Sequence, residues 1–202
     1  MNCLVVAELD GGLLNRPTLA TIYAATNFSK NIDVVILDPA KKEEIAKTDK
    51  IRKVLHTENK KSNILAEEIV PFINELSQNY DFIIAPSGTF SKNFMPRLAA
   101  KLDTQLISDV INIHSEDTFD RPIYAGNAIA TVKSNDKIKL LTVRTTAFPP
   151  VSNEIGTAHL EKVADPLETS KCKFLTSELS QSERPELSSA KIIVSAGRGI
   201  GS

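Results

Sequence analysis

The chain has 202 residues, 42% hydrophobic and 24% charged, so it can bury a sizeable core and has the composition of a soluble globular protein. Its 24 basic and 25 acidic side chains give a net charge of −1, which excludes a strong field for nucleic acid or an anionic membrane. No segment is apolar for long enough to insert into a membrane. The first residues lack the patterns of a secretory signal or a mitochondrial presequence, so we expect a cytoplasmic protein.

The first hundred residues alternate between strand and helix patterns. Short apolar runs predict four strands, at Cys3–Ala7, Ile32–Leu37, Lys53–His56 and Phe82–Ala85. Strands that alternate with helices in this way are typical of a parallel sheet with helices packed on its faces.

Three helical patterns separate or follow these strands. The first opens with Pro17, which suits a first helical position. Its predicted buried face consists of Leu19, Ile22 and Tyr23. The second runs from Ser62 to Ser77 with a kink predicted at Pro71, and the third begins with Ser91 as N-cap.

After residue 102 the pattern changes to extended segments. We predict antiparallel strands, added to the parallel core, at Gln105–His114, Ile123–Val132 and Lys137–Arg144. Residues 147–189 have weak periodicity, and their best short strand is Lys173–Leu175. Gln181–Ser189 has the composition of an interdomain linker, and the apolar run Lys191–Val194 predicts the first buried parallel strand of a second domain.

Two turns follow predicted strands at the same edge of the sheet, at Glu8–Gly12 and Pro86–Thr89. Ligands of parallel α/β sheets bind beyond the carboxyl ends of the strands, so these turns could hold a nucleotide or a phosphate. Neither turn matches a dinucleotide-binding or P-loop fingerprint, and we favour ordinary strand-to-helix turns.

The sequence offers no convincing catalytic or metal-ligating set. Ser87, His114 and Asp109 could be imagined as a hydrolytic triad, but the Gly-x-Ser-x-Gly pattern around a nucleophilic serine is missing. The two cysteines and three histidines are scattered without metal-ligand spacing. We therefore assign no catalytic residue and no metal site.

The turn Gly197–Gly201 has glycines at alternate positions with Arg198 between the first two. Glycines allow close backbone approach, and a guanidinium suits a pyrophosphate or the electron-rich edge of a reduced cofactor ring. A glycine turn that carries a solvated arginine is an equally good interpretation of this local pattern.

Several stretches taken together carry a resemblance to a known family. They are Ser91–Leu102, Ile107–Val110, Ile123–Ala128, Ser182–Leu187 and Ile193–Gly199. In this order they closely resemble the α subunits of electron transfer flavoproteins. The resemblance covers essentially the whole chain, and the stretch from Arg184 to Gly199 is distinctive for that family.

The resemblance implies a heterodimer of α and β subunits that carries one FAD, with AMP on the β subunit and not on this chain. Such a carrier accepts electrons from acyl-CoA dehydrogenases and related flavoenzymes and passes them to a membrane-associated flavoprotein-quinone oxidoreductase. It converts no substrate of its own. It works in the bacterial cytoplasm, or in the mitochondrial matrix if the source is eukaryotic.

The resemblance also implies a domain division and one FAD contact. Residues 1–180 would be the N-terminal α/β domain, with a mainly parallel sheet, flanking helices and an added antiparallel portion. Residues 181–189 would be the linker, and residues 190–202 would begin a Rossmann-like FAD domain that is truncated at Ser202. The family's FAD-binding arginine matches Arg198, flanked by Gly197 and Gly199, and most other FAD contacts would lie beyond Ser202.

Two other functions stay open at this point. The domain could be a cofactor-free scaffold for the β subunit, or an α/β module that binds AMP or ATP at the turns after Ala7 and Ala85.

Overall fold

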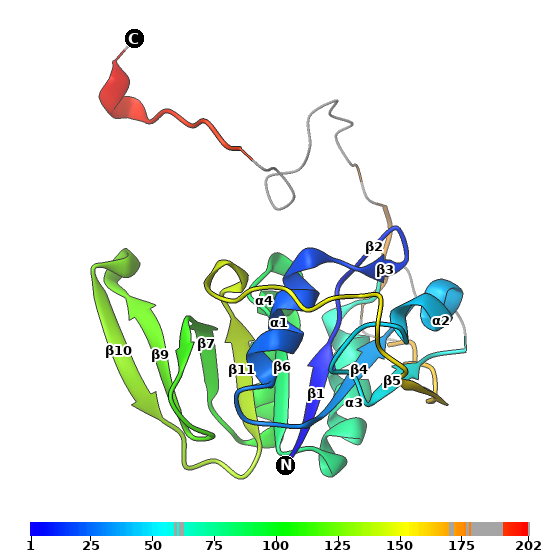
Figure 1. Cartoon of the computed structure of the whole chain (residues 1–202). Helices are drawn as coiled ribbons and strands as arrows, with labels where there is room; N and C mark the ends of the chain where they lie inside the picture. Colours follow the sequence, from blue (N-terminus) through cyan, green and yellow to red (C-terminus); the bar gives the residue numbers. More distant parts are fainter. Residues whose placement is uncertain (59, 61–62, 170–171, 177, 179–191, 202) are drawn as a thin grey trace.

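Seven strands of the computed structural model pair side by side in one sheet, and every pairing between them is parallel. The structure describes residues 1–58, 60, 63–169, 172–176, 178 and 192–201. In spatial order the strands are β12 (His159–Lys162), β5 (Lys53–His56), β4 (Asn31–Ile36), β1 (Asn2–Val6), β6 (Phe82–Pro86), β11 (Lys139–Val143) and β7 (Leu106–Val110). This sheet, with its helices and a smaller antiparallel sheet, confirms the predicted fold class (Figure 1).

The helices cover both faces of the parallel sheet. α1 (Arg16–Ala25) lies on one face, and α3 (Ala66–Leu76) and α4 (Thr89–Leu102) lie side by side on the other (Figure 1). The short α2 (Lys42–Ile45) follows β4. In β1, Cys3 and Val5 pack with the α1 face, while Leu4 and Val6 pack with the α3 and α4 face. Burial on both faces explains why the central strands are continuous apolar runs.

Two further groups of strands and five single turns of 3-10 helix complete the described part of the chain. β8 (Asn112–Ile113), β9 (Thr118–Ile123) and β10 (Ala128–Lys133) form an antiparallel sheet, and β2 (Leu9–Asp10) and β3 (Leu13–Leu14) form a hairpin. The 3-10 turns are η1 (Pro39–Lys41), η2 (Ser77–Asn79), η3 (Tyr124–Gly126), η4 (Thr145–Ala147) and η5 (Arg198–Ile200).

The prediction of antiparallel strands at residues 105–114 and 137–144 was wrong for β7 and β11 and correct only for β8, at the end of the first segment. β7 and β11 are both parallel to the core strands, and β11 lies between β6 and β7. α4 connects β6 to β7. The antiparallel strands β8, β9 and β10 then return the chain to the amino ends of the parallel strands, where β11 begins. β11 therefore runs in the same direction as its neighbours.

The predicted strand Ile123–Val132 is interrupted by a hairpin turn at its start. Three successive residues, Tyr124, Ala125 and Gly126, have positive φ angles of 49°, 54° and 90°. A left-handed backbone at these positions reverses the chain between β9 and β10. The antiparallel portion is consequently limited to β8, β9 and β10.

Helix boundaries differ from the predicted ones where tertiary contacts decide them. α4 begins at Thr89 with Gly88 as its N-cap, so Ser91 is a buried residue of the first turn and not the cap. α3 begins at Ala66, and Pro71 lies inside it. In α1, Tyr23 is 40% exposed, because the buried face contains small residues and Ile22.

The strands predicted after residue 147 agree least with the structure. Residues 173–175 form no strand, whereas the short and half-polar segment β12 pairs with β5 at the sheet edge. Ile192, Ile193 and Val194 have no strand partner in the described structure and are 84%, 56% and 94% exposed. The described residues therefore do not show the buried parallel strand that was predicted here. Lys191 and the predicted linker 181–189 lie outside the described residues, so the domain division stays a prediction.

One buried ionic network sits at the amino ends of β4 and β5. Asp33 is 1% exposed and accepts hydrogen bonds from Arg52 Nε at 2.9 Å and Arg52 Nη2 at 2.7 Å. The Tyr80 hydroxyl donates a third bond to Asp33, at 2.7 Å. Burial, followed by the hydrogen bond to Asp33 and its negative charge, raises the pKa of Tyr80. Asp33 and Tyr80 are buried, while the side chain of Arg52 is 38% exposed and completes the network at the surface.

Removing the Tyr80 hydroxyl tests this network. We expect Tyr80→Phe to lower the free energy of unfolding by about 1.5–3 kcal/mol, the contribution of a hydrogen bond to a charged group. Because the pKa of Tyr80 is raised in the folded state, the wild-type protein also loses stability above about pH 10, where the unfolded-state tyrosine ionises, and the variant lacks that loss. Urea unfolding at several pH values measures both effects. Tyr23→Phe is the control, because Tyr23 is exposed. An equal loss of unfolding free energy in both variants would contradict a stabilising hydrogen bond from Tyr80 to Asp33.

Candidate functional site

The order of the strands reverses at the carboxyl ends of β1 and β6. From β1 the chain proceeds to β4 and β5 on one side, and later to β6, α4 and β7 on the other. In open α/β sheets this switch point is where ligands bind. The turns at Glu8–Gly12 and Pro86–Thr89 were predicted to share one edge, and they meet here: Ser91 Oγ lies 3.4 Å from Glu8 Oε1.

The side chain of Glu8, at the start of the first turn, packs against the second turn and the start of α4. A Cβ added to Gly88 would lie 2.9 Å from Glu8 Oε1, so the carboxylate packs directly on the residue that caps α4. Its backbone is fixed because the Glu8 N–H donates to Thr18 Oγ1 at 2.9 Å, and the Asn15 N–H donates to the Glu8 carbonyl at 3.2 Å. Burial raises the pKa of the Glu8 carboxyl, and hydrogen bonds from Asn15 and Ser91 act in the opposite direction.

This arrangement bears directly on the predicted alternative of an AMP or ATP module. A nucleotide phosphate at a switch point would face the first turn of the following helix. In this chain the carboxylate of Glu8 already faces that turn, where it would repel a phosphate. The geometry therefore favours the interpretation of these segments as structural turns.

The imagined triad is not assembled. His114 Nε2 lies 2.7 Å from Asp120 Oδ2 on the antiparallel sheet, and Asp109, near the end of β7, forms an ion pair with Arg144, which directly follows β11. Burial raises the pKa of Asp109, but the hydrogen bond and charge of Arg144, together with Ser87 and the charge of Lys92, lower the pKa overall. The histidine is thus paired with a different aspartate from the one that the triad would need. Within the described residues, no group of three or more His, Cys, Asp or Glu side chains could hold a metal ion.

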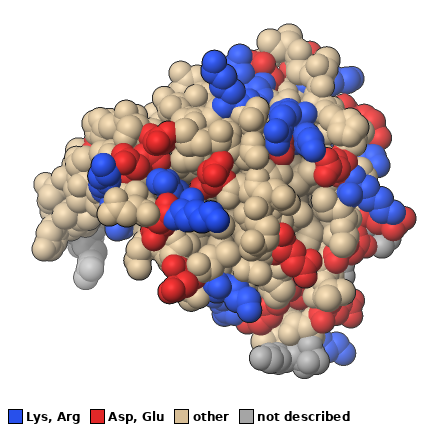
Figure 2. All heavy atoms as spheres, turned by 90° about the horizontal axis from the view of Figure 1, so that it is seen from below, with Lys and Arg blue, Asp and Glu red and all other residues tan. Residues whose placement is uncertain are grey.

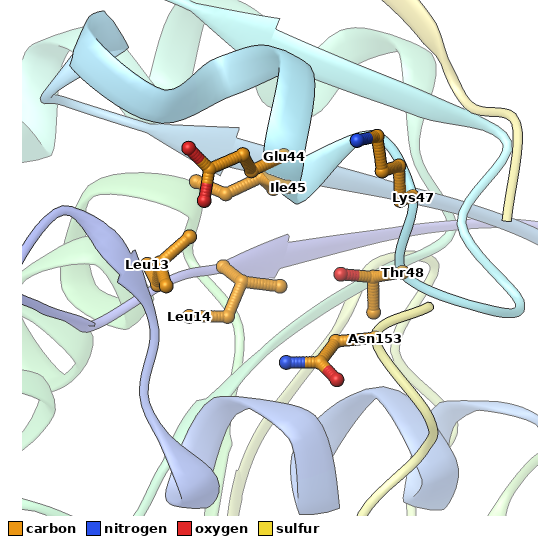
Figure 3. Close-up of a pocket in the computed structure, with 7 residues that line it drawn as sticks. All are labelled: Leu13, Leu14, Glu44, Ile45, Lys47, Thr48 and Asn153. Atoms are coloured by element: carbon orange, nitrogen blue, oxygen red, sulfur yellow. The ribbon is translucent and has the colours of Figure 1, made fainter. Parts of the chain in front are cut away.

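A pocket of about 330 Å³ lies beside the β2–β3 hairpin (Figure 3). Leu13, Leu14 and Ile45 form its apolar part, and the polar side chains of Glu44, Lys47, Thr48 and Asn153 complete it. Glu44 and Lys47 are exposed and opposite in charge, so the pocket selects neither anions nor cations. No sequence signal pointed to it, since its residues come from three separate stretches.

The turn with the predicted FAD contact is described as far as Gly201. Arg198–Ile200 form the 3-10 turn η5, and the Ile200 N–H donates to the Gly197 carbonyl at 3.1 Å. Gly197 and Gly199 are exposed and have open space where a Cβ would stand. An open glycine turn next to an arginine fits one edge of a dinucleotide such as FAD. The turn alone could hold only a small part of so large a cofactor.

Charges of both signs are mixed on the face at the amino ends of the parallel strands. Figure 2 shows Lys and Arg interspersed with Asp and Glu there, without a continuous patch of one sign. Such a face offers no footprint for nucleic acid. Among the helices that the structure describes, none is both long and apolar enough to cross a membrane.

Comparison with known proteins places this fold in a family. Residues 3–168 match the model of the electron transfer flavoprotein domain. The chain is 45% identical over 204 residues to "Electron transfer flavoprotein subunit alpha" of Pseudomonas aeruginosa and 41% identical over 206 residues to the protein of the same name from Paracoccus denitrificans. It is also 42% identical over 205 residues to "Probable electron transfer flavoprotein subunit alpha, mitochondrial" of Caenorhabditis elegans.

The chain therefore belongs to the electron transfer flavoprotein family, which confirms the resemblance seen in the sequence. The three alignments cover 99%, 100% and 98% of this chain, respectively. They cover 66%, 67% and 61% of the relatives, so the chain spans about two thirds of their length. All three relatives are named as α subunits of an electron carrier.

The half-buried carboxylate of Glu8 makes a testable pH prediction. Because the folded-state pKa of Glu8 is raised, its contribution to stability is present below the unfolded-state pKa of about 4.3 and is lost as the pH rises through the folded-state value. We expect Glu8→Gln to gain stability relative to the wild-type protein between pH 4 and pH 7. Urea unfolding at both pH values measures the difference. Glu154→Gln, on an exposed side chain, is the control, and a pH-independent difference for Glu8→Gln would contradict the prediction.

Proposed function

We propose that this chain is part of the α subunit of a heterodimeric electron carrier that works with a β subunit and FAD. The observation that carries the proposal is the 45% identity over 99% of the chain to a protein named electron transfer flavoprotein subunit alpha. The carrier accepts electrons from acyl-CoA dehydrogenases and related flavoenzymes. It passes them to a membrane-associated flavoprotein-quinone oxidoreductase.

In this proposal the two parts of the chain have different tasks. The parallel sheet and its helices provide a rigid platform that packs against the β subunit. The turn at Gly197–Gly199 approaches FAD, which supplies the ring that takes up and releases electrons when it is bound. Arg198 carries a permanent positive charge, which would offset the negative charge that FAD gains on reduction. AMP belongs to the β subunit, in agreement with the position of Glu8 at the switch point of this chain.

We also propose a location from the same relationship. The carrier works in the cytoplasm of a bacterium, or in the mitochondrial matrix if the source is eukaryotic. The names of the relatives from Caenorhabditis elegans and Dictyostelium discoideum include the word mitochondrial.

The role of Arg198 can be tested in the heterodimer formed by the complete gene product and its β subunit. We expect Arg198→Ala to weaken FAD binding by about 10- to 100-fold, as for the loss of a hydrogen bond to a charged group, or to lower the flavin potential. Flavin absorbance per heterodimer and a redox titration measure the two effects. Arg198→Lys keeps the charge and is the control. Unchanged FAD content and potential in Arg198→Ala would refute the assignment.

The partner can be tested with the 202-residue chain itself. We expect a tagged chain, co-expressed with the β subunit from the same source, to retain that subunit through size-exclusion chromatography. A colourless complex would support the alternative that this portion is a cofactor-free scaffold for the β subunit. Elution of the two chains as separate species, at concentrations well above 1 μM, would contradict a heterodimer built on this domain.

A further inference from the structure

An arginine lies on the core-facing side of the antiparallel sheet. Side chains alternate along β9, and Phe119, which is 0% exposed, marks the face that packs on the core. Arg121 shares that face, and the register places it opposite Ala130 of β10. Alanine leaves room beside a long side chain, so the guanidinium reaches inward between the two sheets.

The positive charge of Arg121 has no acidic partner among the described residues. Its Nη2 donates to Ser108 Oγ of β7 at 2.9 Å, and a hydroxyl is a neutral acceptor. Its Nε is buried and has no hydrogen-bond partner in the part of the chain that the structure describes. A partly buried cation without a counter-ion is costly, and an orphaned donor beside it adds to that cost.

Arg121 lines a pocket of about 420 Å³ between the two sheets. Leu106, Ile107 and Val132 supply its apolar surface, while Ser134 and Asn135 supply polar groups. Ligand pockets of small molecules have this volume and this combination of apolar walls with few polar groups.

The two other charged side chains of the pocket are already engaged. Lys133 forms an ion pair with Asp117 at 3.1 Å. Asp136 Oδ2 accepts hydrogen bonds from the Gln105 N–H at 3.3 Å and from the Ser134 hydroxyl at 3.1 Å. Among the described residues, Arg121 is therefore the cation of this pocket that forms no ion pair, while Asp136 is held by neutral donors.

We propose that this pocket binds a small organic anion. The carboxylate or phosphate head of the ligand pairs with the guanidinium of Arg121, which presents donors in a planar fork suited to either group. The apolar body of the ligand packs on Leu106, Ile107 and Val132. This site is independent of the proposed FAD contact at Arg198, because it is formed within the N-terminal sheets.

Three probes that share a phenyl ring test the site on the purified chain. Benzoate and phenyl phosphate carry the two candidate head groups, and benzamide is a neutral analogue of benzoate. Chemical shifts of backbone amides in a ¹H–¹⁵N spectrum report where each probe binds. We expect saturable shifts at Leu106, Ile107 and Val132 with one or both anions, and binding of benzamide at least about tenfold weaker than benzoate if benzoate binds.

Variants connect the binding to Arg121. Arg121→Met removes the charge and keeps an apolar side chain, so we expect it to weaken binding by about 10- to 100-fold, as for the loss of a hydrogen bond to a charged group. Arg121→Lys keeps the positive charge but lacks the planar set of guanidinium donors. We expect it to bind the anions more weakly than the wild-type protein and more tightly than Arg121→Met, which separates the loss of charge from a loss of folding. Lys137→Gln removes the same charge from an exposed neighbouring position and should bind like the wild-type protein.

The proposal is overturned if neither anion produces saturable shifts at the pocket. It is equally overturned if benzamide binds as well as benzoate, or if Arg121→Met, folded by its dispersed spectrum, binds the anions as the wild-type protein does. Binding of phenyl phosphate alone assigns a phosphate head group, and binding of benzoate alone assigns a carboxylate. Either result supports the site, and failure of the FAD experiment at Arg198 would leave it standing.

Discussion

Burial of the parallel sheet on both faces is the constraint on which the rest of this structure depends. With α1 on one side and α3 and α4 on the other, the central strands are almost entirely apolar, and Asp33, near the start of β4, is the charged exception. Polar and charged groups are consequently concentrated at the two ends of the strands. The network of Asp33, Arg52 and Tyr80 closes the amino ends of β4 and β5, and Glu8 closes the carboxyl ends of β1 and β6.

The same constraint explains how much of the fold could be predicted. The strands at the centre, β1, β4 and β6, were found within one residue of their ends because complete burial demands a continuous apolar run. β12 has only one apolar residue in four, and pairing at a sheet edge leaves little trace in the sequence. The direction of β7 and β11 is set by the route of the chain through β8, β9 and β10, and no local pattern encodes such a route.

The arrangement of a site could be predicted only where its residues directly follow strands that are recognisable in the sequence. The meeting of Glu8 with the turn at Gly88 followed from the rule that carboxyl ends of parallel strands share one edge. The pockets beside Leu13 and beside Arg121 were missed because each combines residues from separate segments. Arg121 could have been noticed: it interrupts the apolar positions at Phe119 and Ile123 with a charge, at the spacing of a strand face. The role of Arg198 came from family resemblance and not from local pattern.

The exposed run Ile192–Val194 has a consequence for handling the protein. Within the described part of the chain, these three branched apolar side chains have no strand partner and are largely exposed to solvent. β-branched residues pair readily as strands, and an uncovered strand is a template for pairing with another molecule. In concentrated solution this segment is a natural starting point for self-association. Solubility of the chain therefore depends on whether another surface covers these three residues.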